Sequence, residues 1–250
     1  MNSADGRRGA AVGGLLLVAA LASGCAAAGP TGPDGRAAAE ARPGSPAARP
    51  VDARELLAAA LPDDEIAPAG SAEKKVYEPD PGHALASVGA PDCVTLTDPY
   101  RDGPQPATVV QTFHSKENLE WTGATTLTAH PGPTAAAGEF DRLRKAVQGC
   151  REFHWRDVYS GNGTGTRATL TAVQAPAQGD EAVAYTLTLL TDVSDINPEV
   201  PEIRTIRRVA VVRIGSVIAQ FRLEPSPSAE TMEFPAELMA RQVQRLRSLP

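Results

Sequence analysis

The chain has 250 residues and a formal net charge of −6 at pH 7, from 24 Lys and Arg against 30 Asp and Glu. An acidic chain repels phosphate backbones, so this balance argues against a nucleic-acid-binding protein. The length after an N-terminal targeting region suffices for one domain with a sizeable core.

The first 24 residues predict an export signal. Arg7 and Arg8 form a positive n-region, and residues 10–22 are an uncharged, mostly apolar stretch of 13 residues. A membrane-spanning helix needs about 20 residues. The stretch is therefore typical of the h-region of a signal peptide, which is removed from the mature protein.

Ser23-Gly24-Cys25 follows the apolar stretch and resembles the bacterial lipobox, whose cysteine carries the lipid. A usual lipobox has Leu three residues before the Cys, whereas here Ala22 holds that place and Leu21 lies one residue further back. We expect a lipoprotein acylated at Cys25, with chains such as palmitate, on the extracytoplasmic side of the cell membrane. The alternative is an ordinary secretory signal cut within residues 26–28.

Residues 25–50 are rich in Ala, Pro and Gly and contain no large apolar side chain after Cys25. Such a segment cannot form a core and predicts a disordered, semi-rigid tether. We expect residues 51–250 to form a single folded domain.

Two cysteines remain besides Cys25, namely Cys93 and Cys150. An exported protein meets an oxidising compartment, and two cysteines allow one pairing. We expect a Cys93–Cys150 disulfide; the alternative is two buried free thiols.

The first predicted element is a short helix that begins after Asp52. Asp52 and Glu55 have the spacing of a capping box, and Pro62 ends the helix. Residues 62–92 are rich in Pro, Asp, Gly and Ala and are expected to be extended and mostly irregular.

Two β-rich segments follow, at residues 108–113 and 125–128, before a helix at 134–149. The apolar positions of this helix are spaced 4, 3, 4 and 3 residues apart and form one stripe: Ala136, Phe140, Leu143, Val147 and Cys150. Cys150 is therefore expected in the core, where a strand carrying Cys93 could meet it. The disulfide would link this helix to the sheet.

The second half predicts strands at residues 167–174, 182–191, 205–213 and 217–223 and a last helix at 235–248. Gly215-Ser216 between two apolar runs is a hairpin signal. Apolar and polar residues alternate along 217–223, so one face of that strand is buried. The order of elements predicts an α+β fold, an antiparallel sheet with packed helices.

Tests for catalytic and metal-binding patterns give weak signals. His154-Trp155-Arg156-Asp157 with Asn162 has part of the spacing of a kinase catalytic loop, but no Gly-rich nucleotide loop, β3 Lys or D-F-G motif accompanies it. The four histidines are too far apart for a local metal motif. Trp121 and Trp155 are expected in the core, with a ligand cleft as the alternative. We assign no catalytic, cofactor or metal residue.

The stretch from about residue 88 to 249 resembles the extracellular sensor domain of PknH-type actinobacterial Ser/Thr kinases, which also occurs alone on lipoproteins. The similarity rests on the order of Cys93, Trp121, Gly149-Cys150-Arg151, Gly179-Asp180-Glu181-Ala182, Arg213-Ile214-Gly215-Ser216-Val217 and a terminal helix with Gln242, Arg245 and Leu246. The resemblance implies a twisted antiparallel sheet with helices packed on it and a ligand-binding cleft. The kinase domains carry two disulfides, whereas this chain can form one besides Cys25, so no ligand residues are transferred.

The functional expectation is a non-catalytic sensor-like domain that binds a small molecule or a cell-envelope component, with a separate signalling protein as a partner. The alternatives are a cell-envelope hydrolase with a dispersed active site and a structural or chaperone-like envelope protein. Convergent carboxylates or a histidine–nucleophile pair in the main cleft would favour the hydrolase.

Overall fold

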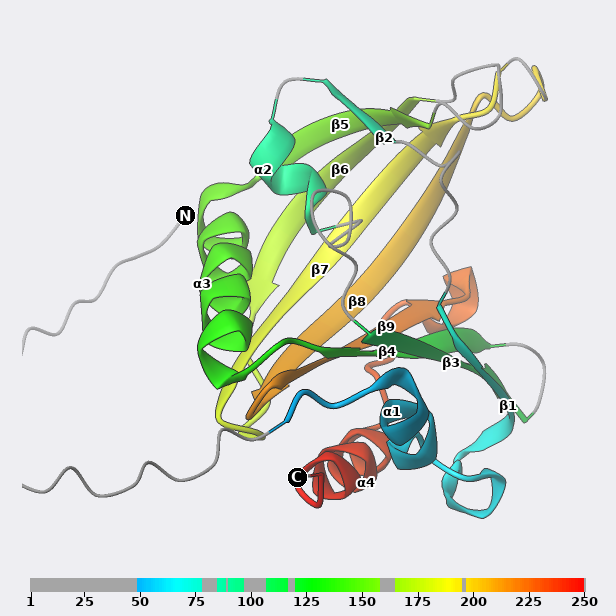
Figure 1. Cartoon of the computed structure of the whole chain (residues 1–250). Helices are drawn as coiled ribbons and strands as arrows, with labels where there is room; N and C mark the ends of the chain where they lie inside the picture. Colours follow the sequence, from blue (N-terminus) through cyan, green and yellow to red (C-terminus); the bar gives the residue numbers. More distant parts are fainter. Residues whose placement is uncertain are drawn as a thin grey trace, which may run out of the picture. The chain divides into compact units, whose positions relative to one another are not determined.

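One antiparallel sheet organises the folded part of the chain (Figure 1). Within the described residues it has nine strands in the order β1-β3-β4-β9-β8-β7-β6-β5-β2. The strands are β1 Ala69–Val76, β2 Leu85–Val88, β3 Ala107–Ser115, β4 Trp121–Ala129, β5 Glu152–Asp157, β6 Gly165–Val173, β7 Glu181–Asp192, β8 Glu202–Ile214 and β9 Val217–Pro225.

The computed structural model describes residues 49–77, 85–88, 90–96, 107–116, 120–157, 165–194 and 197–249. These ranges belong to a compact unit, Pro46–Pro250. The signal peptide, Cys25 and nearly all of the tether lie outside them. No helix in these ranges is long and apolar enough to cross a membrane.

The helices are α1 Ala53–Ala59, α2 Pro91–Val94, α3 Pro133–Gly149 and α4 Ala236–Leu246, with 3-10 turns at Asp63–Glu65 and Pro227–Ala229. The predicted capping box of α1 is present. The Glu55 backbone N–H donates to Asp52 Oδ1 at 2.8 Å, and the Asp52 N–H donates to Glu55 Oε2 at 3.1 Å. Each pairing satisfies an N–H that has no partner inside the helix.

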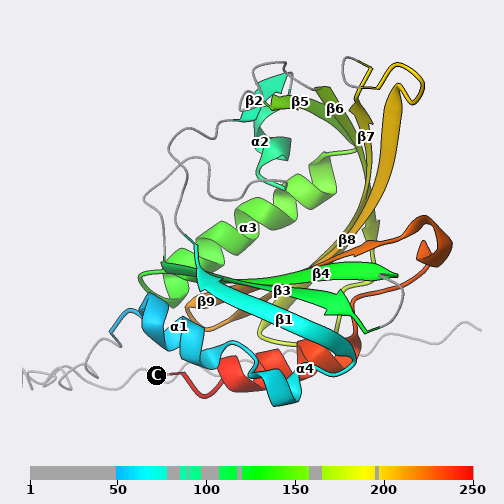
Figure 2. The ribbon, with the colours of Figure 1, turned by 90° about the vertical axis from the view of Figure 1, so that its right-hand side faces the viewer.

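Alternate residues of the central strand β8 enter different hydrophobic cores. Val209 and Val211 belong to the core under α2 and α3, whereas Ala210 and Val212 belong to the core under α1 and α4. Successive side chains of a strand point to opposite faces, so the two helix pairs cover opposite faces of one sheet. Figure 2 shows α3 on one side of β3, β4 and β9, with α1 and α4 on the other.

Strands β5 to β8 curve around α3, so the face that carries α3 is concave (Figure 2). The α2/α3 core fills this concave face over β5 to β8, and the α1/α4 core fills the opposite, convex face over β1, β3, β4 and β9. Each end of the sheet therefore has one face on which helices pack and one face without a packed helix.

Most expected elements are present. The α3 stripe is buried at Ala136, Phe140, Val147 and Cys150 and partly buried at Leu143, and β8 and β9 form a hairpin through Gly215-Ser216. The expected α+β fold is thereby confirmed.

The expectation of a mostly irregular segment over residues 62–92 is wrong. It contains β1, β2 and the start of α2. Strand β1 lacks an apolar alternation because it is an edge strand: of its eight residues only Ala69 is fully buried. It is held by backbone pairing with β3, which a hydrophobic pattern does not reveal.

Candidate functional site

The concave face continues beyond α3 as a polar surface on β3, β4, β8 and β9. Arg222 lies opposite Val209, and Gln220 lies opposite Val211. Directly opposed residues share a face, and these two valines point into the α2/α3 core. The same pairing rule places these polar residues on the concave face: Thr112, His114, Thr122, Arg207, Gln220, Arg222 and Glu224.

An open depression of about 210 Å³ lies on this polar surface. It is lined by Thr112, Phe113, His114, Thr122, Gly123, Arg222 and Glu224. Phe113 buries its side chain in the α1/α4 core, so the polar side chains of β3, β4 and β9 supply the chemistry of the lining. We treat this depression as the candidate site.

Two guanidinium groups lie near one carboxylate beside the depression, and only one of them is hydrogen-bonded to it. Arg207 Nε donates to Glu224 Oε1 at 2.8 Å, whereas Arg222 Nε lies 3.7 Å from the same oxygen. Burial lowers the pKa of Arg222, and the charge of Arg207 lowers it further, while Glu224 raises it. The site therefore holds one more positive than negative charge among these three side chains.

Tyr185 connects the sheet to the segment after α2. Its hydroxyl donates to the Leu96 carbonyl oxygen at 3.2 Å, and its side chain is fully buried. Burial raises the pKa of this phenol well above its usual range, so it stays protonated and remains a donor. The bond holds residues 90–96 against the α3 side of the concave face.

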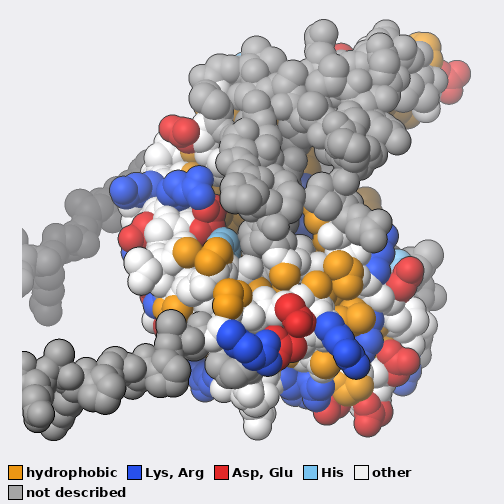
Figure 3. Space-filling model, viewed as in Figure 1, with side chains coloured by type: hydrophobic (Ala, Val, Ile, Leu, Met, Phe, Trp, Pro, Cys, Tyr) orange, Lys and Arg blue, Asp and Glu red, His pale blue; other side chains and the backbone are white. Residues whose placement is uncertain are grey.

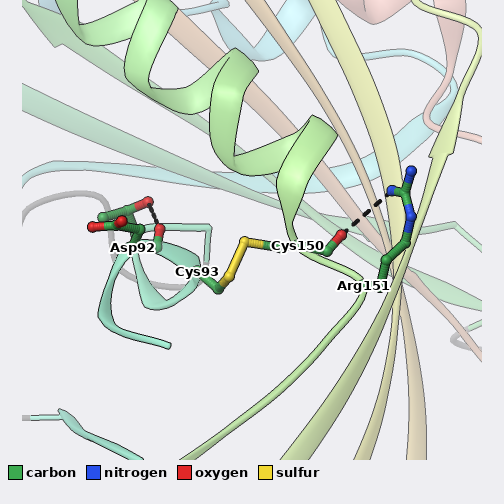
Figure 4. Close-up of a disulfide and its surroundings, with 5 residues drawn as sticks. Asp92, Cys93, Cys150 and Arg151 are labelled. Atoms are coloured by element: carbon green, nitrogen blue, oxygen red, sulfur yellow. Dashed lines mark hydrogen bonds between the residues drawn. A yellow bond between two sulfur atoms is a disulfide. The ribbon is translucent and has the colours of Figure 1, made fainter. Parts of the chain in front are cut away.

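The Cys93–Cys150 disulfide is confirmed (Figure 4). The two Cα atoms are 5.8 Å apart, within the usual range of about 4.4–6.8 Å. The expected strand around Cys93 is wrong, because Pro91 starts the short helix α2 there. The disulfide joins α2 to the end of α3, helix to helix, and fixes α2 beside the sheet.

Two of the motifs that carry the family resemblance, at residues 179–182 and 213–217, are joined by hydrogen bonds and ion pairs. Asp180 accepts a hydrogen bond from the Gly215 N–H at 2.8 Å, and Glu181 accepts from Arg213 Nε at 2.6 Å. Glu181 also pairs with Arg144 of α3. These cations, Arg213 first, hold the pKa of Glu181 below its usual range. The two motifs therefore tie α3 to the β7 and β8 ends.

Gly179 has a strict backbone role in this network. Its φ is +71°, and a Cβ at this position would lie 2.2 Å from Val212 Cγ1. A side chain would need both a disfavoured backbone conformation and a displaced core valine.

Both tryptophans lie in the hydrophobic cores. Trp121 is buried in the α1/α4 core, and Trp155 packs against Phe153 in the α2/α3 core with ring centroids 5.8 Å apart. His154 is exposed on the other face of β5. Asn162 and the side chains of Arg156 and Asp157 lie outside the described residues, so the kinase-like string is described only in part.

The histidines occupy separate environments. His114 is exposed at the depression and His130 is half-buried after β4, while His83 lies outside the described residues. Within the described ranges, no group of three or more His, Cys, Asp or Glu side chains could hold a metal ion.

Sequence reasoning identified Arg222 only as part of the polar side of an alternating strand, and it missed Arg207, Glu224 and Tyr185. The signal present was the alternation along 217–223. The pattern separates two faces but does not show that the sheet curves, or that the polar face of β9 lies beside α3.

No family model matches the chain, and no curated protein matches it. The extracellular domain of PknH from Mycobacterium tuberculosis matches in structure, with a TM-score of 0.52 and 13% sequence identity over 80% of this chain and 99% of that one. A putative uncharacterized protein (Rv0999 ortholog) from Mycobacterium smegmatis gives a TM-score of 0.41 and 10% identity over 79% and 97%. The first match confirms the expected resemblance at the level of the fold: the chain folds like the extracellular domain of PknH.

Proposed function

We propose that the chain is a lipoprotein anchored through Cys25 on the extracytoplasmic side of the cell membrane. Its folded unit would be a non-catalytic, sensor-like domain that binds a small molecule or a cell-envelope component. A separate signalling protein would read the bound state. The fold shared with an extracellular domain of a kinase supports an extracytoplasmic role.

The observation that carries the binding proposal is the polar depression on the concave face. Its lining combines hydroxyls of Thr112 and Thr122, the imidazole of His114 and the charged pair Arg222 and Glu224. Ligand sites are concave, and a few convergent polar groups fix the orientation of the ligand; this depression supplies such groups. Nearby, the disulfide and the Tyr185–Leu96 hydrogen bond hold α2 and residues 90–96 in place, so the α3 side of this face is preorganised.

Lipidation is tested with Cys25→Ser. We expect the wild-type protein in the membrane fraction, with a mass increase equal to the lipid, and the variant in the soluble fraction. Intact mass spectrometry that finds an unmodified mature N-terminus at Ala26 or later would contradict the anchor. That result would leave the binding proposal standing.

Binding is tested by NMR on ¹⁵N-labelled Pro46–Pro250, because both hydrophobic cores and the disulfide lie within this compact unit. Soluble peptidoglycan fragments and a panel of small metabolites serve as probes. We expect saturable shifts at the amides of Thr112 and Thr122 for at least one probe. Thr122→Val should weaken that response, and Thr169→Val, an exposed β6 position on the convex face, is the matched control.

The same preparation tests the absence of catalysis. Nucleotides, acyl esters and peptidoglycan fragments should remain unchanged after prolonged incubation. Turnover that one point substitution abolishes would favour the envelope-hydrolase alternative and overturn the non-catalytic part of the proposal.

A further inference from the structure

We infer that the depression binds an anionic group, a carboxylate or a phosphate, through the guanidinium of Arg222. The inference rests on the proposed function, because it assigns a ligand class to the same site.

The first argument is the charge balance of the site. Glu224 is engaged by Arg207, whose Nε lies 2.8 Å from the carboxylate oxygen. Arg222 lies 3.7 Å from that oxygen, beyond hydrogen-bond length, so its donors are not used by this carboxylate. An arginine presents a planar fork of donors that suits the two oxygens of a carboxylate or phosphate.

The second argument is a comparison with the arginines of the neighbouring strand. All four arginines of β8 lie within 2.8 Å of a carboxylate: Arg204 with Glu230, Arg207 with Glu224, Arg208 with Glu233 and Arg213 with Glu181. Arg222 of β9 differs from these four, because its ion pair with Glu224 is 3.7 Å long. Positive and negative side chains also alternate over α1 and α4 on the surface seen in Figure 3. Among the arginines of β8 and β9, Arg222 is thus the one without a carboxylate at hydrogen-bond distance.

The third argument is the environment of Arg222. Its side chain is 43% exposed, so it is reachable from solvent while partly desolvated. Burial and the charge of Arg207 both disfavour the charged guanidinium, as the lowered pKa of Arg222 records. A bound anion would compensate this charge and strengthen its own hydrogen bonds, because charge-assisted bonds are stronger where water is partly removed.

The fourth argument concerns size and the remaining donors. The depression holds about 210 Å³, below the roughly 300–1,000 Å³ of sites that enclose a whole small molecule. It therefore suits one end of a ligand, such as an acidic headgroup. His114 and Thr122 at the rim can add hydrogen bonds to anion oxygens, whereas the Thr112 hydroxyl donates to the Glu73 carbonyl oxygen.

The test is an NMR titration of ¹⁵N-labelled Pro46–Pro250 with inorganic phosphate and with acetate, each against sodium chloride at matched ionic strength. We expect saturable shifts at Thr112, Thr122 and Arg222. Arg222→Gln should weaken the affinity by roughly tenfold or more, because charge-assisted hydrogen bonds to the anion are lost. Arg167→Gln, an exposed arginine on the convex face of β6, should change nothing.

Glu224→Gln is a second variant that separates anion binding from misfolding. Misfolding would weaken anion binding, whereas this variant is expected to strengthen it. Removing the carboxylate frees Arg207 and leaves two uncompensated guanidiniums, so anion affinity should rise several-fold. Equal phosphate affinity in wild type and Arg222→Gln, or weaker binding in Glu224→Gln, would overturn the inference.

Vesicle co-sedimentation distinguishes two sources of the anion. Binding to phosphatidylglycerol vesicles but not to phosphatidylcholine vesicles, lost in Arg222→Gln, would assign a lipid headgroup. Shifts with phosphate or acetate alone would assign a free solute. A neutral peptidoglycan fragment that shifts the Thr112 and Thr122 amides while both anions fail would refute the anion assignment and leave the proposed function intact.

Discussion

The two hydrophobic cores pack on one sheet, but different interactions hold their helices in place. In the α1/α4 core, two fully buried glutamines bind the backbone at the end of α1 and directly after it. Gln111 donates to the Leu61 carbonyl at 2.8 Å, Gln242 donates to the Ala59 carbonyl at 2.9 Å, and both side-chain oxygens lie 3.2 Å from the Leu61 N–H. These bonds satisfy backbone groups that the end of α1 leaves without helical partners.

The α2/α3 core is stabilised by a covalent cross-link instead. Its helix α2 has only four residues, and it is held by the disulfide and by the nearby Tyr185–Leu96 hydrogen bond. Helix α3 is additionally paired to β7 through Arg144 and Glu181. The comparison teaches that the short helix α2 is kept in place by a cross-link, whereas the longer helices α1 and α4 are kept in place by buried amides.

The largest effect should come from the disulfide. Cys93 and Cys150 are 57 residues apart, and a loop of that length corresponds to about 4 kcal/mol in the free energy of unfolding by chain entropy. We expect Cys93→Ser/Cys150→Ser to lose a similar amount in urea denaturation. Hydrogen exchange should rise first at residues 90–96 and 146–150. An equal loss of protection in α1 and α4 would contradict the conclusion that the two cores are stabilised by separate interactions.

The opposite half should respond to Gln242. We expect Gln242→Ala to cost about 2–3 kcal/mol, because it removes two buried hydrogen bonds and leaves a cavity. Exposed Gln244, two residues along α4, is the control, and its change to Ala should stay within about 0.5 kcal/mol. Exchange should increase in α1 and α4 while residues 146–150 keep their protection. If both substitutions lowered the free energy of unfolding equally, the hydrogen bonds of Gln242 would not be what holds this core.

A smaller, stabilising change is available on α3. A Cβ at exposed Gly138 would meet no atom within 4 Å, so Gly138→Ala should stabilise the protein by about 0.5–1 kcal/mol through helix propensity. Gly179→Ala should have the opposite sign, because of its positive φ and its contact with Val212. Thermal unfolding of both variants checks the pair, and stabilisation by Gly179→Ala would show that the turn is not strained.

The smallest expected effect is a pH dependence at the junction of the two halves. His130 follows β4 before α3, and burial, followed by the charge of Arg142, lowers its pKa from the usual 6.5. The unfolded chain then binds a proton more readily than the folded protein near pH 6, so stability should fall as pH drops from 7 to 5. His130→Asn should flatten this slope in urea denaturation, and an unchanged slope would assign it to other groups.

Much of the α+β fold follows from local pattern. The stripe from Ala136 to Cys150 predicted a buried helix face, and the alternation of 217–223 with Gly215-Ser216 predicted the β8–β9 hairpin; both are present. These patterns work because a helix repeats every 3.6 residues and a strand every two, whatever surrounds them. Strand β1 was not predicted, because an exposed edge strand needs no apolar period.

By itself the sequence determined the elements with a strong period. It also limited any disulfide besides Cys25 to Cys93 with Cys150, and the structure shows that this bond is formed. Only the tertiary structure decided that Cys93 lies on a helix and that Arg207, Arg222 and Glu224 meet on a concave face. Strand alternation states which side chains share a face. The curvature of the sheet and the positions of α2 and α3 depend on long-range packing, and these determine which polar face becomes a site.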